Sequence, residues 1–211
     1  MSAVSEAAPF DPRPEEPRNQ PASDAGADQE FMRRLQAGDQ AALAGLMDRW
    51  ELPVKRVIGR MIFNATEAGD LAQETFVRVW QQREKFKAGA EFRPWVFAMA
   101  VNLARNRLRW WRRRPEVALE EWSETQTAEE GGRRTEPAMG SAAMEREERA
   151  VAVREAIAAL PMDLREALVL FEYEEMSHAE IAEAVGATPK AVETRIARAR
   201  EKLRGALKRW A

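Results

Sequence analysis

The residues with the clearest capacity for chemistry lie in one basic stretch, 94–114, whose apolar spacing is helical. Asn102 and Asn106 are one helical turn apart there, and residues 105–114 hold six arginines and no acid. So many arginines on one helix indicate a surface for phosphates, with a solvated helix end as the alternative. Asparagine amides in that field can hydrogen-bond exposed base edges. The stretch therefore predicts a nucleic-acid site with these members: Asn102, Arg105, Asn106, Arg109, Arg112 and Arg113.

A second candidate site lies near the C-terminus, where Gly186 separates two short helical segments. Residues 177–180 (Ser-His-Ala-Glu) match a capping box for the first segment. Thr188 and Pro189 are a favourable cap and first position for the second. Segment 189–211 carries eight basic and two acidic residues, as expected of a helix-turn-helix reading the DNA major groove. An ordinary helical hairpin is the alternative. The residues predicted to face DNA are Lys190, Glu193, Thr194, Arg195, Ala197, Arg198 and Arg200.

A third surface lies on the predicted helix 70–86 and is acidic and rich in amides. Its apolar stripe comprises Leu71, Thr75, Phe76, Val79 and Trp80. The opposite face carries Asp70, Gln73, Glu74 and Val77. Negative charge beside an apolar side chain is poorly suited to DNA but could bind a helix of another protein. A plain solvated face is the alternative for this pattern taken alone.

The elements that position these surfaces are helical, and they fall into two groups. Residues 1–27 hold five of the eleven prolines and are predicted to be a disordered tail. Residues 28–114 and 148–211 show helical periodicity, whereas residues 115–147 hold nine glutamates against three arginines. The sequence therefore predicts an all-α protein in which a flexible acidic linker joins two small helical domains, the C-terminal one a helix-turn-helix.

Several local signals set expected helix boundaries. Pro53 is predicted to open a helical run that extends to Phe63, and Thr66 is predicted to cap the helix that follows. Residues 163–166 (Asp-Leu-Arg-Glu) resemble a capping box. In the basic helix, the residues predicted to face inward are Val96, Met99, Ala100, Leu103 and Trp111.

Composition excludes several classes of chemistry. The absence of cysteine rules out disulfides, thiolate zinc sites and cysteine nucleophiles, and the single His178 cannot form a multi-histidine site. Asp70 and Glu74 could share a cation, but no third ligand is identifiable, so no enzyme activity, metal or cofactor is expected. No run approaches the roughly 18 apolar residues of a membrane span, and no secretory signal is evident. The cytoplasm is the expected compartment.

Taken together, the segments resemble the extracytoplasmic-function class of the sigma-70 family of bacterial RNA polymerase sigma factors. The resemblance covers about 28–114 and 148–211, with its motifs in family order. In the first domain it is carried by Asp70-Leu71-Ala72-Gln73-Glu74-Thr75-Phe76-Val77-Arg78-Val79-Trp80, Phe92-Arg93-Pro94-Trp95-Val96-Phe97 and Ala100-Val101-Asn102-Leu103-Ala104-Arg105-Asn106. In the second domain it is carried by Leu160-Pro161, Leu164-Arg165, Glu180-Ile181-Ala182 and Val192-Glu193-Thr194-Arg195-Ile196-Ala197-Arg198-Ala199-Arg200.

The resemblance implies a role for each surface. The set Asp70, Gln73, Glu74 and Val77 would dock on the polymerase core. Asn102 and Asn106 would receive flipped, single-stranded bases of the upstream melted promoter element, with segment 87–91 helping to cage one base. In the last helix, Glu193, Thr194, Ala197 and Arg198 would face base edges of the distal element, and Lys190, Arg195 and Arg200 would contact phosphates. The implied partners are core polymerase, duplex and single-stranded promoter DNA, and an anti-sigma factor.

Two readings compete with this expectation. A stand-alone helix-turn-helix regulator explains residues 177–211 but gives no account of Asn102, Asn106 or the acidic helix. A nucleic-acid enzyme would need clustered acids or an activated nucleophile.

A linker of about 33 residues can span up to roughly 100 Å, and two promoter elements separated by two to two and a half duplex turns need about 70–85 Å. The sigma-factor reading is therefore geometrically possible, and it predicts a factor that opens and reads promoters only with the polymerase.

Overall fold

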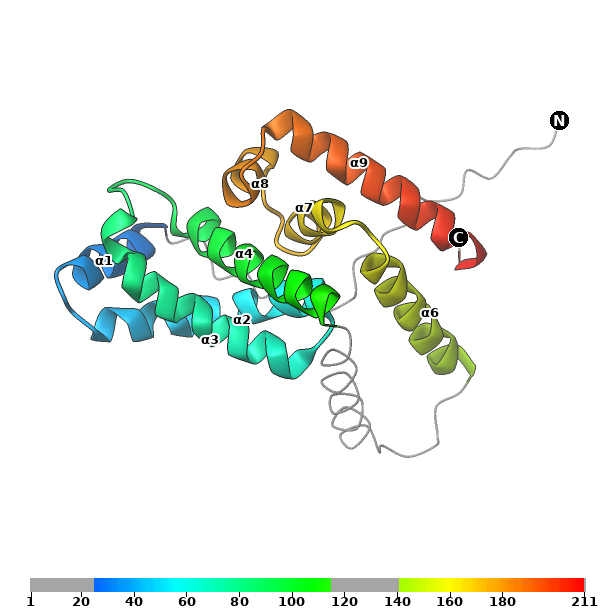
Figure 1. The fold of residues 1–211 in the computed structure, drawn as a ribbon, viewed down its shortest axis with the longest axis horizontal. Coiled ribbons are helices and arrows are strands. Elements are labelled where there is room, and N and C mark those ends of the chain that lie inside the picture. The colour runs from blue at the N-terminus through cyan, green and yellow to red at the C-terminus, as the bar shows by residue number, and fades with distance from the viewer. Residues whose placement is uncertain (1–24, 115–140, 211) are drawn as a thin grey trace.

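The computed structural model describes residues 25–114 and 141–210, which are helical with short connections (Figure 1). The all-α prediction is confirmed over these ranges. The N-terminal group consists of α1 (Ala25–Gln36), α2 (Ala41–Ile62), α3 (Ala65–Gln82), the 3-10 turn η1 (Arg83–Lys85) and α4 (Phe92–Arg113). The C-terminal group consists of α6 (Ser141–Ala158), α7 (Met162–Glu172), α8 (His178–Val185), α9 (Pro189–Ala206) and the 3-10 turn η2 (Lys208–Trp210).

Helix α2 is the centre of the N-terminal group and contacts α1, α3 and α4. Its apolar stripe is buried against them, and Trp50 meets the rings of Phe92 and Phe97 edge to face. Asp28 of α1 joins the two helices, because its carboxylate accepts hydrogen bonds from Trp50 Nε1 at 3.1 Å and from Arg49 Nε at 2.8 Å. The packing places α3 and α4 side by side with one face of each exposed.

Three predicted boundaries in this group are wrong. Helix α1 begins at Ala25, so the last three residues of the predicted tail are helical; residues 1–24 lie outside the described ranges. Pro53 does not open a helix but lies buried inside α2. A proline in a helix interior costs about 3 kcal/mol, and burial of one continuous apolar stripe before and after Pro53 offsets this cost. The cap of α3 is Asn64, whose side chain accepts from Glu67 N at 2.9 Å, rather than Thr66.

The identity of this cap is testable by mutation. We expect Asn64→Ala to lower the free energy of unfolding by about 1–2 kcal/mol, because it removes the capping acceptor at a buried helix end. Thr66→Ala, at an exposed position two residues further on, should change it by less than about 0.5 kcal/mol. Urea denaturation followed by circular dichroism measures both values. Equal losses in the two variants would contradict the assignment of Asn64 as the cap.

The C-terminal group contains the predicted helix-turn-helix, and its start and stop signals are confirmed. Ser177 and Glu180 form a reciprocal capping box at α8, and Gly186 ends that helix with φ of 69°. Thr188 accepts a hydrogen bond from Ala191 N and caps α9, whose first residue is Pro189. Helix α6 begins at Ser141, so the last seven residues of the predicted linker are helical; its remainder, 115–140, lies outside the described ranges.

The two helical groups are packed directly on each other. Helix α4 contacts α8, and α2 contacts α6 and α7; Figure 1 shows α4 (green) between α3 and α8. One hydrophobic cluster runs through both groups, from Met32 to Ile196. A second, smaller cluster lies within the C-terminal group around Leu168 and Leu203. The structure is therefore a closed arrangement of two domains, which residue patterns within either domain do not predict.

Candidate polymerase and nucleic-acid interfaces

Helix α4 presents the basic surface expected from the sequence. The five residues predicted to face inward are buried: Val96, Met99, Ala100, Leu103 and Trp111. Five of the six predicted DNA-binding residues are exposed on the other side: Asn102, Asn106, Arg109, Arg112 and Arg113. Since both asparagine amides are exposed in a field of guanidinium groups, this face has the donors and acceptors that an unpaired base requires.

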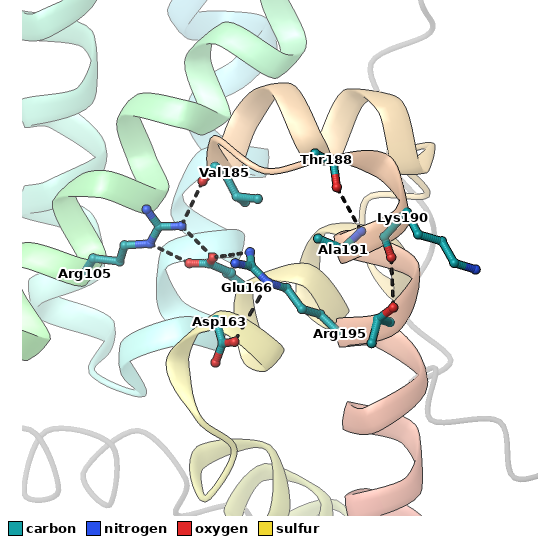
Figure 2. A network of polar contacts seen from close by, with 9 residues as sticks. Arg105, Asp163, Glu166, Val185, Thr188, Lys190, Ala191 and Arg195 are labelled. Carbon is teal, nitrogen blue, oxygen red and sulfur yellow. Dashed lines mark hydrogen bonds and ion pairs between the residues drawn. The ribbon is translucent and has the colours of Figure 1, made fainter.

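The sixth residue, Arg105, is in a different situation. Its Nε and Nη2 donate to the Glu166 carboxylate at 2.6 Å and 2.5 Å, and Nη2 lies 3.4 Å from the Val185 carbonyl oxygen. Its Nη1 donates to Asn102 Oδ1 at 3.3 Å. Figure 2 shows this side chain reaching from α4 to the C-terminal domain. One predicted DNA-binding arginine is therefore engaged by a carboxylate of the other domain.

Glu166 is the residue of the site that sequence reasoning missed. The capping box predicted for residues 163–166 is wrong, because the N-cap of α7 is Pro161 and no side chain caps it. Glu166 is instead buried, with a side chain 1% exposed. Arg195 of α9 also approaches it, with Nη1 at 3.6 Å from Oε1 and Nε at 3.8 Å from Asp163 Oδ2. No local sequence signal marks Glu166, because its main partner, Arg105, comes from the other domain.

The remaining residues of the helix-turn-helix surface are exposed: Lys190, Glu193, Thr194, Ala197, Arg198 and Arg200. Lys190 Nζ pairs with Glu193 at 2.9 Å and holds the pKa of that carboxyl below its usual range. Arg200 pairs with Glu172 of α7 at 2.5 Å and lies over the Phe171 ring. Within the described residues, Arg198 has no ion pair, so it is the freest cation on this face for a base edge or a phosphate.

The predicted protein-binding surface on α3 is also exposed. All four of its members, Asp70, Gln73, Glu74 and Val77, face solvent, and Val77 is one of the large hydrophobic residues with more than half of its surface exposed, at 51%. Glu74 forms an i,i+4 ion pair with Arg78 at 2.8 Å. The stripe predicted to face inward is buried except for Trp80, which is half-buried under the Arg83 guanidinium.

The loop between η1 and α4 contains segment 87–91, predicted to help cage a base. Its start is held by Gln36 of α1, whose Nε2 donates to the carbonyl oxygens of Arg83 at 2.8 Å and Phe86 at 2.9 Å. The Phe86 ring packs on Trp95 at 5.1 Å between ring centroids. Gly89 has φ of 80°, a backbone conformation that glycine adopts without strain. The loop therefore has anchored ends and an exposed centre beside the start of α4.

A buried acid lies at the domain contact and was not singled out by the sequence. Glu174, between α7 and α8, is 8% exposed, and burial raises its pKa to about 7 although Arg60, Arg93 and Arg56 act in the opposite direction. Arg93 of α4 donates to the Glu174 carbonyl oxygen and lies 3.7 Å from Glu180. The contact thus places arginines of the first domain against acids and carbonyls of the second.

The raised pKa predicts a pH-dependent stability. Between pH 4.5 and about 7, the folded protein keeps a proton on Glu174 that the unfolded chain has already released. The free energy of unfolding therefore falls as pH rises through that window. The full effect is about 3 kcal/mol. The free energy of unfolding, measured by denaturation at pH 5 and at pH 8, should differ less between the two pH values for Glu174→Gln than for the unmodified protein. The control Glu183→Gln, at an exposed position, should retain the original difference, and identical profiles for all three would contradict the prediction.

Residues 25–114 and 141–210 contain no group of three or more His, Cys, Asp or Glu side chains arranged to hold a metal ion. Within the same ranges, every helix is too short or too polar to cross a membrane.

Comparison with protein families identifies both domains. Residues 46–114 match the family model described as Sigma-70 region 2, and residues 150–203 match the model described as Sigma-70, region 4. The RNA polymerase sigma-H factor of Pseudomonas aeruginosa is 32% identical over 85% of this chain and 93% of its own length. The ECF RNA polymerase sigma-E factor of Escherichia coli (strain K12) is 33% identical over 82% of this chain and 91% of its own length.

Two solved structures share the fold of this chain. CnrH, solved in complex with the cytosolic domain of CnrY, superposes with a TM-score of 0.64 and 25% identity, covering 88% of this chain and 99% of that one. The sigma factor RpoE from Bartonella quintana, solved with the anti-sigma factor NepR, shares the fold with a TM-score of 0.56 and 21% identity, covering 78% and 96%.

The chain therefore belongs to the sigma-70 family, in its extracytoplasmic-function (ECF) class. Its function is that of an RNA polymerase sigma factor, a transcription initiation factor that works with core polymerase and promoter DNA. The two matched regions together account for the basic α4 face and for the helix-turn-helix. A stand-alone helix-turn-helix regulator would account for the helix-turn-helix but not for the basic α4 face.

Proposed function

We propose that this sigma factor docks on core polymerase through α3 and reads promoter DNA through α4 and α9. The docking residues are Asp70, Gln73, Glu74 and Val77. The melted upstream element would be bound by Asn102, Arg105, Asn106, Arg109, Arg112 and Arg113. The distal element would be bound by Lys190, Glu193, Thr194, Arg195, Ala197, Arg198 and Arg200. Residues 28–114 and 148–211 would be the two functional domains.

The observation that carries this proposal is the position of Asn102 and Asn106, both exposed on one face of a helix whose opposite face is buried. Extruding a base from a duplex costs a few kcal/mol of unstacking. Hydrogen bonds between these two amides, presented on one helix face, and the extruded bases offset part of that cost and keep the strand open. The arginines one turn away hold the backbone of the same strand.

Binding both promoter elements requires the two domains to separate. Helix α4 contacts α8, and α8 contacts α9. Packed helices lie about 8–10 Å apart. Because α8 lies between them, α4 and α9 are within roughly 20 Å of each other at their nearest points. Promoter elements two to two and a half turns apart need about 70–85 Å. The segment between Arg114 and Ser141 is long enough to span roughly 90 Å when extended, so an open form is within reach.

An anti-sigma factor is part of the proposal. Both structural relatives were solved in complex with a second protein, which is named an anti-sigma factor for RpoE. The likeness to CnrH extends over 88% of this chain and so includes both domains. We infer that a partner of this kind binds the closed arrangement of this chain and withholds it from the polymerase.

The proposed roles consist of binding alone. Docking, base capture and backbone contact need no nucleophile, metal or cofactor, so we infer that the chain catalyses no reaction itself. Because its partner is the transcribing polymerase, we infer that it acts in the bacterial cytoplasm.

The test is stoichiometric binding to bacterial core polymerase. The purified protein is mixed with core enzyme and the mixture is separated by size exclusion, with a promoter-containing template added in a second run. Co-elution at one copy per core and promoter-directed transcripts are expected. A folded protein that neither co-elutes nor supports initiation would overturn the proposal.

A further inference from the structure

One carboxylate joins the two DNA-reading helices in the closed form. Glu166 of α7 accepts two hydrogen bonds from Arg105 of α4 and lies 3.6 Å from Arg195 of α9. Figure 2 shows the three side chains converging, with Asp163 beside Arg195. Arg105 is assigned to the melted element and Arg195 to the distal element. A single buried acid therefore contacts one predicted phosphate-binding residue from each reader.

The surroundings of Glu166 carry an excess of positive charge. A cleft of about 520 Å³ between α4 and the C-terminal domain is lined by five arginines and two acids. The arginines are Arg105, Arg109, Arg112, Arg165 and Arg195. Burial lowers the pKa of Arg165, and the nearby charge of Arg112 lowers it further. Arg195 Nη1 is buried without a hydrogen-bond acceptor. Positive side chains thus outnumber negative ones in the cleft, and Glu166 is the one fully buried carboxylate among its lining residues.

The geometry at Arg105 is the one that a phosphate also takes. A guanidinium binds two oxygens of a carboxylate or a phosphate through the same fork of parallel N–H groups. In the closed form both oxygens belong to Glu166. A promoter phosphate can occupy this fork only after Glu166 has left it. When the carboxylate leaves, it must be rehydrated, since a buried charge that loses its partner is strongly destabilising.

We propose that Glu166 substitutes for a DNA phosphate inside the free protein, holding Arg105 and Arg195 and keeping the two domains closed until the promoter backbone takes these arginines. This inference rests on the proposed function, because it assumes that both arginines bind DNA. Closure and DNA binding are then in competition, so each weakens the other by the same factor.

Other domain contacts stabilise the closed form without involving a predicted DNA contact. Arg165 Nη1 donates to the Met61 carbonyl oxygen at 2.5 Å, and Arg93 approaches Glu180. Arg60 lies over the Tyr173 ring at 4.3 Å. Removing one of these contacts would loosen the interface and leave Arg105 and Arg195 as they are. A substitution at Glu166 therefore tests the link between domain closure and DNA binding, whereas a substitution at the other contacts tests only the stability of the interface.

Domain closure can be measured directly because the chain contains no cysteine. Spin labels on cysteines introduced at exposed Glu84 and Lys202, one in each domain, report the interdomain distance by pulsed electron paramagnetic resonance. We expect one short, narrow distribution for the starting protein. Glu166→Gln should add a long, broad component and raise the open fraction roughly tenfold, because the ion pair is lost.

Glu172→Gln is the matched control. Glu172 lies on the same helix and pairs with Arg200 at 2.5 Å, but both residues belong to the C-terminal domain. This variant removes an ion pair of similar length and should leave the interdomain distance unchanged. Equal distance distributions for Glu166→Gln, Glu172→Gln and the starting protein would overturn the proposal, as would a starting protein that is already open.

A second variant protects the test against misfolding at a buried site. The exchange Arg105→Glu with Glu166→Arg restores an ion pair in the reverse sense, so it should close the domains again while Arg105→Glu alone opens them. In parallel, the free Glu166→Gln protein should bind a single-stranded promoter oligonucleotide roughly tenfold more tightly than the starting protein, following its open fraction. Opening without any gain in DNA binding would refute the competition. Failure of all proteins to bind core polymerase would instead count against the proposed function.

Discussion

Replacing Asp70 by arginine is expected to lower the affinity of the protein for core polymerase by roughly 100-fold. Asp70 is exposed in the second turn of α3, beside Gln73 and Glu74, and the exposed Val77 is two turns further on. An acidic surface with an apolar side chain at one end fits a basic protein helix, and charge reversal at such a contact costs several kcal/mol, which is two or more powers of ten in affinity. Because the Asp70 side chain faces solvent, the stability of the free protein should not change.

The measurement is titration of labelled protein into core polymerase at two salt concentrations, with a thermal melt of each protein as a folding check. Glu84→Arg is the matched control, since Glu84 is an acid in the same domain with 68% of its side chain exposed, beyond the end of α3. It should bind within about twofold of the starting protein, as is usual for a substitution outside an interface. Equal weakening by both substitutions would mean that net charge, rather than the α3 surface, governs docking.

Removing both asparagine amides is expected to lower promoter opening on duplex DNA by about 30-fold to 100-fold. In the double variant Asn102→Ala, Asn106→Ala, each lost base contact should cost about 1–1.5 kcal/mol, which lies within the range for well-placed contacts to base edges. On a template with a preopened, mismatched bubble the loss should be markedly smaller. Unstacking has then already occurred, and base capture no longer has to offset it.

Fluorescence of a base analogue in the melted element, with core polymerase present, follows opening on both templates. Gln40→Ala removes an exposed amide at the start of α2 that forms no side-chain capping bond, and it should leave opening unchanged. A double variant that is unimpaired on both templates would disprove base capture. One equally impaired on both would place the asparagines in strand binding rather than in opening.

Local features of this protein were predictable because they depend on neighbouring residues. The capping box at Ser177, the turn at Gly186 and the start of α9 at Pro189 each involve contacts across a few positions. The inward and outward faces of α3 and α4 follow from helical periodicity, and the structure buries and exposes them as expected, except for Trp80 and Arg105. The resemblance to sigma factors rests on the same short motifs.

The predictions of helix boundaries were wrong where burial outweighed the local conformational preference of a residue. Pro53 continues α2 because the apolar stripe around it is buried against neighbouring helices. Asn64, rather than Thr66, caps α3 because Phe63 ends α2 in the left-handed region and the next residue is already extended. Propensity describes one residue in water, whereas these outcomes depend on which apolar surface the whole domain covers.

By itself, the sequence determined the all-α class, the caps of α8 and α9 and the family, and it indicated three candidate surfaces. Only the tertiary structure decided that the domains close on each other and that Arg105 meets Glu166, 61 positions away. Asp163 and Glu166 have the spacing of a local cap, and nothing within a helical turn shows that Glu166 is buried instead. The physical reason is that a buried carboxylate needs a cation whose approach is set by the packing of α4 on α8, which is a property of the assembled fold.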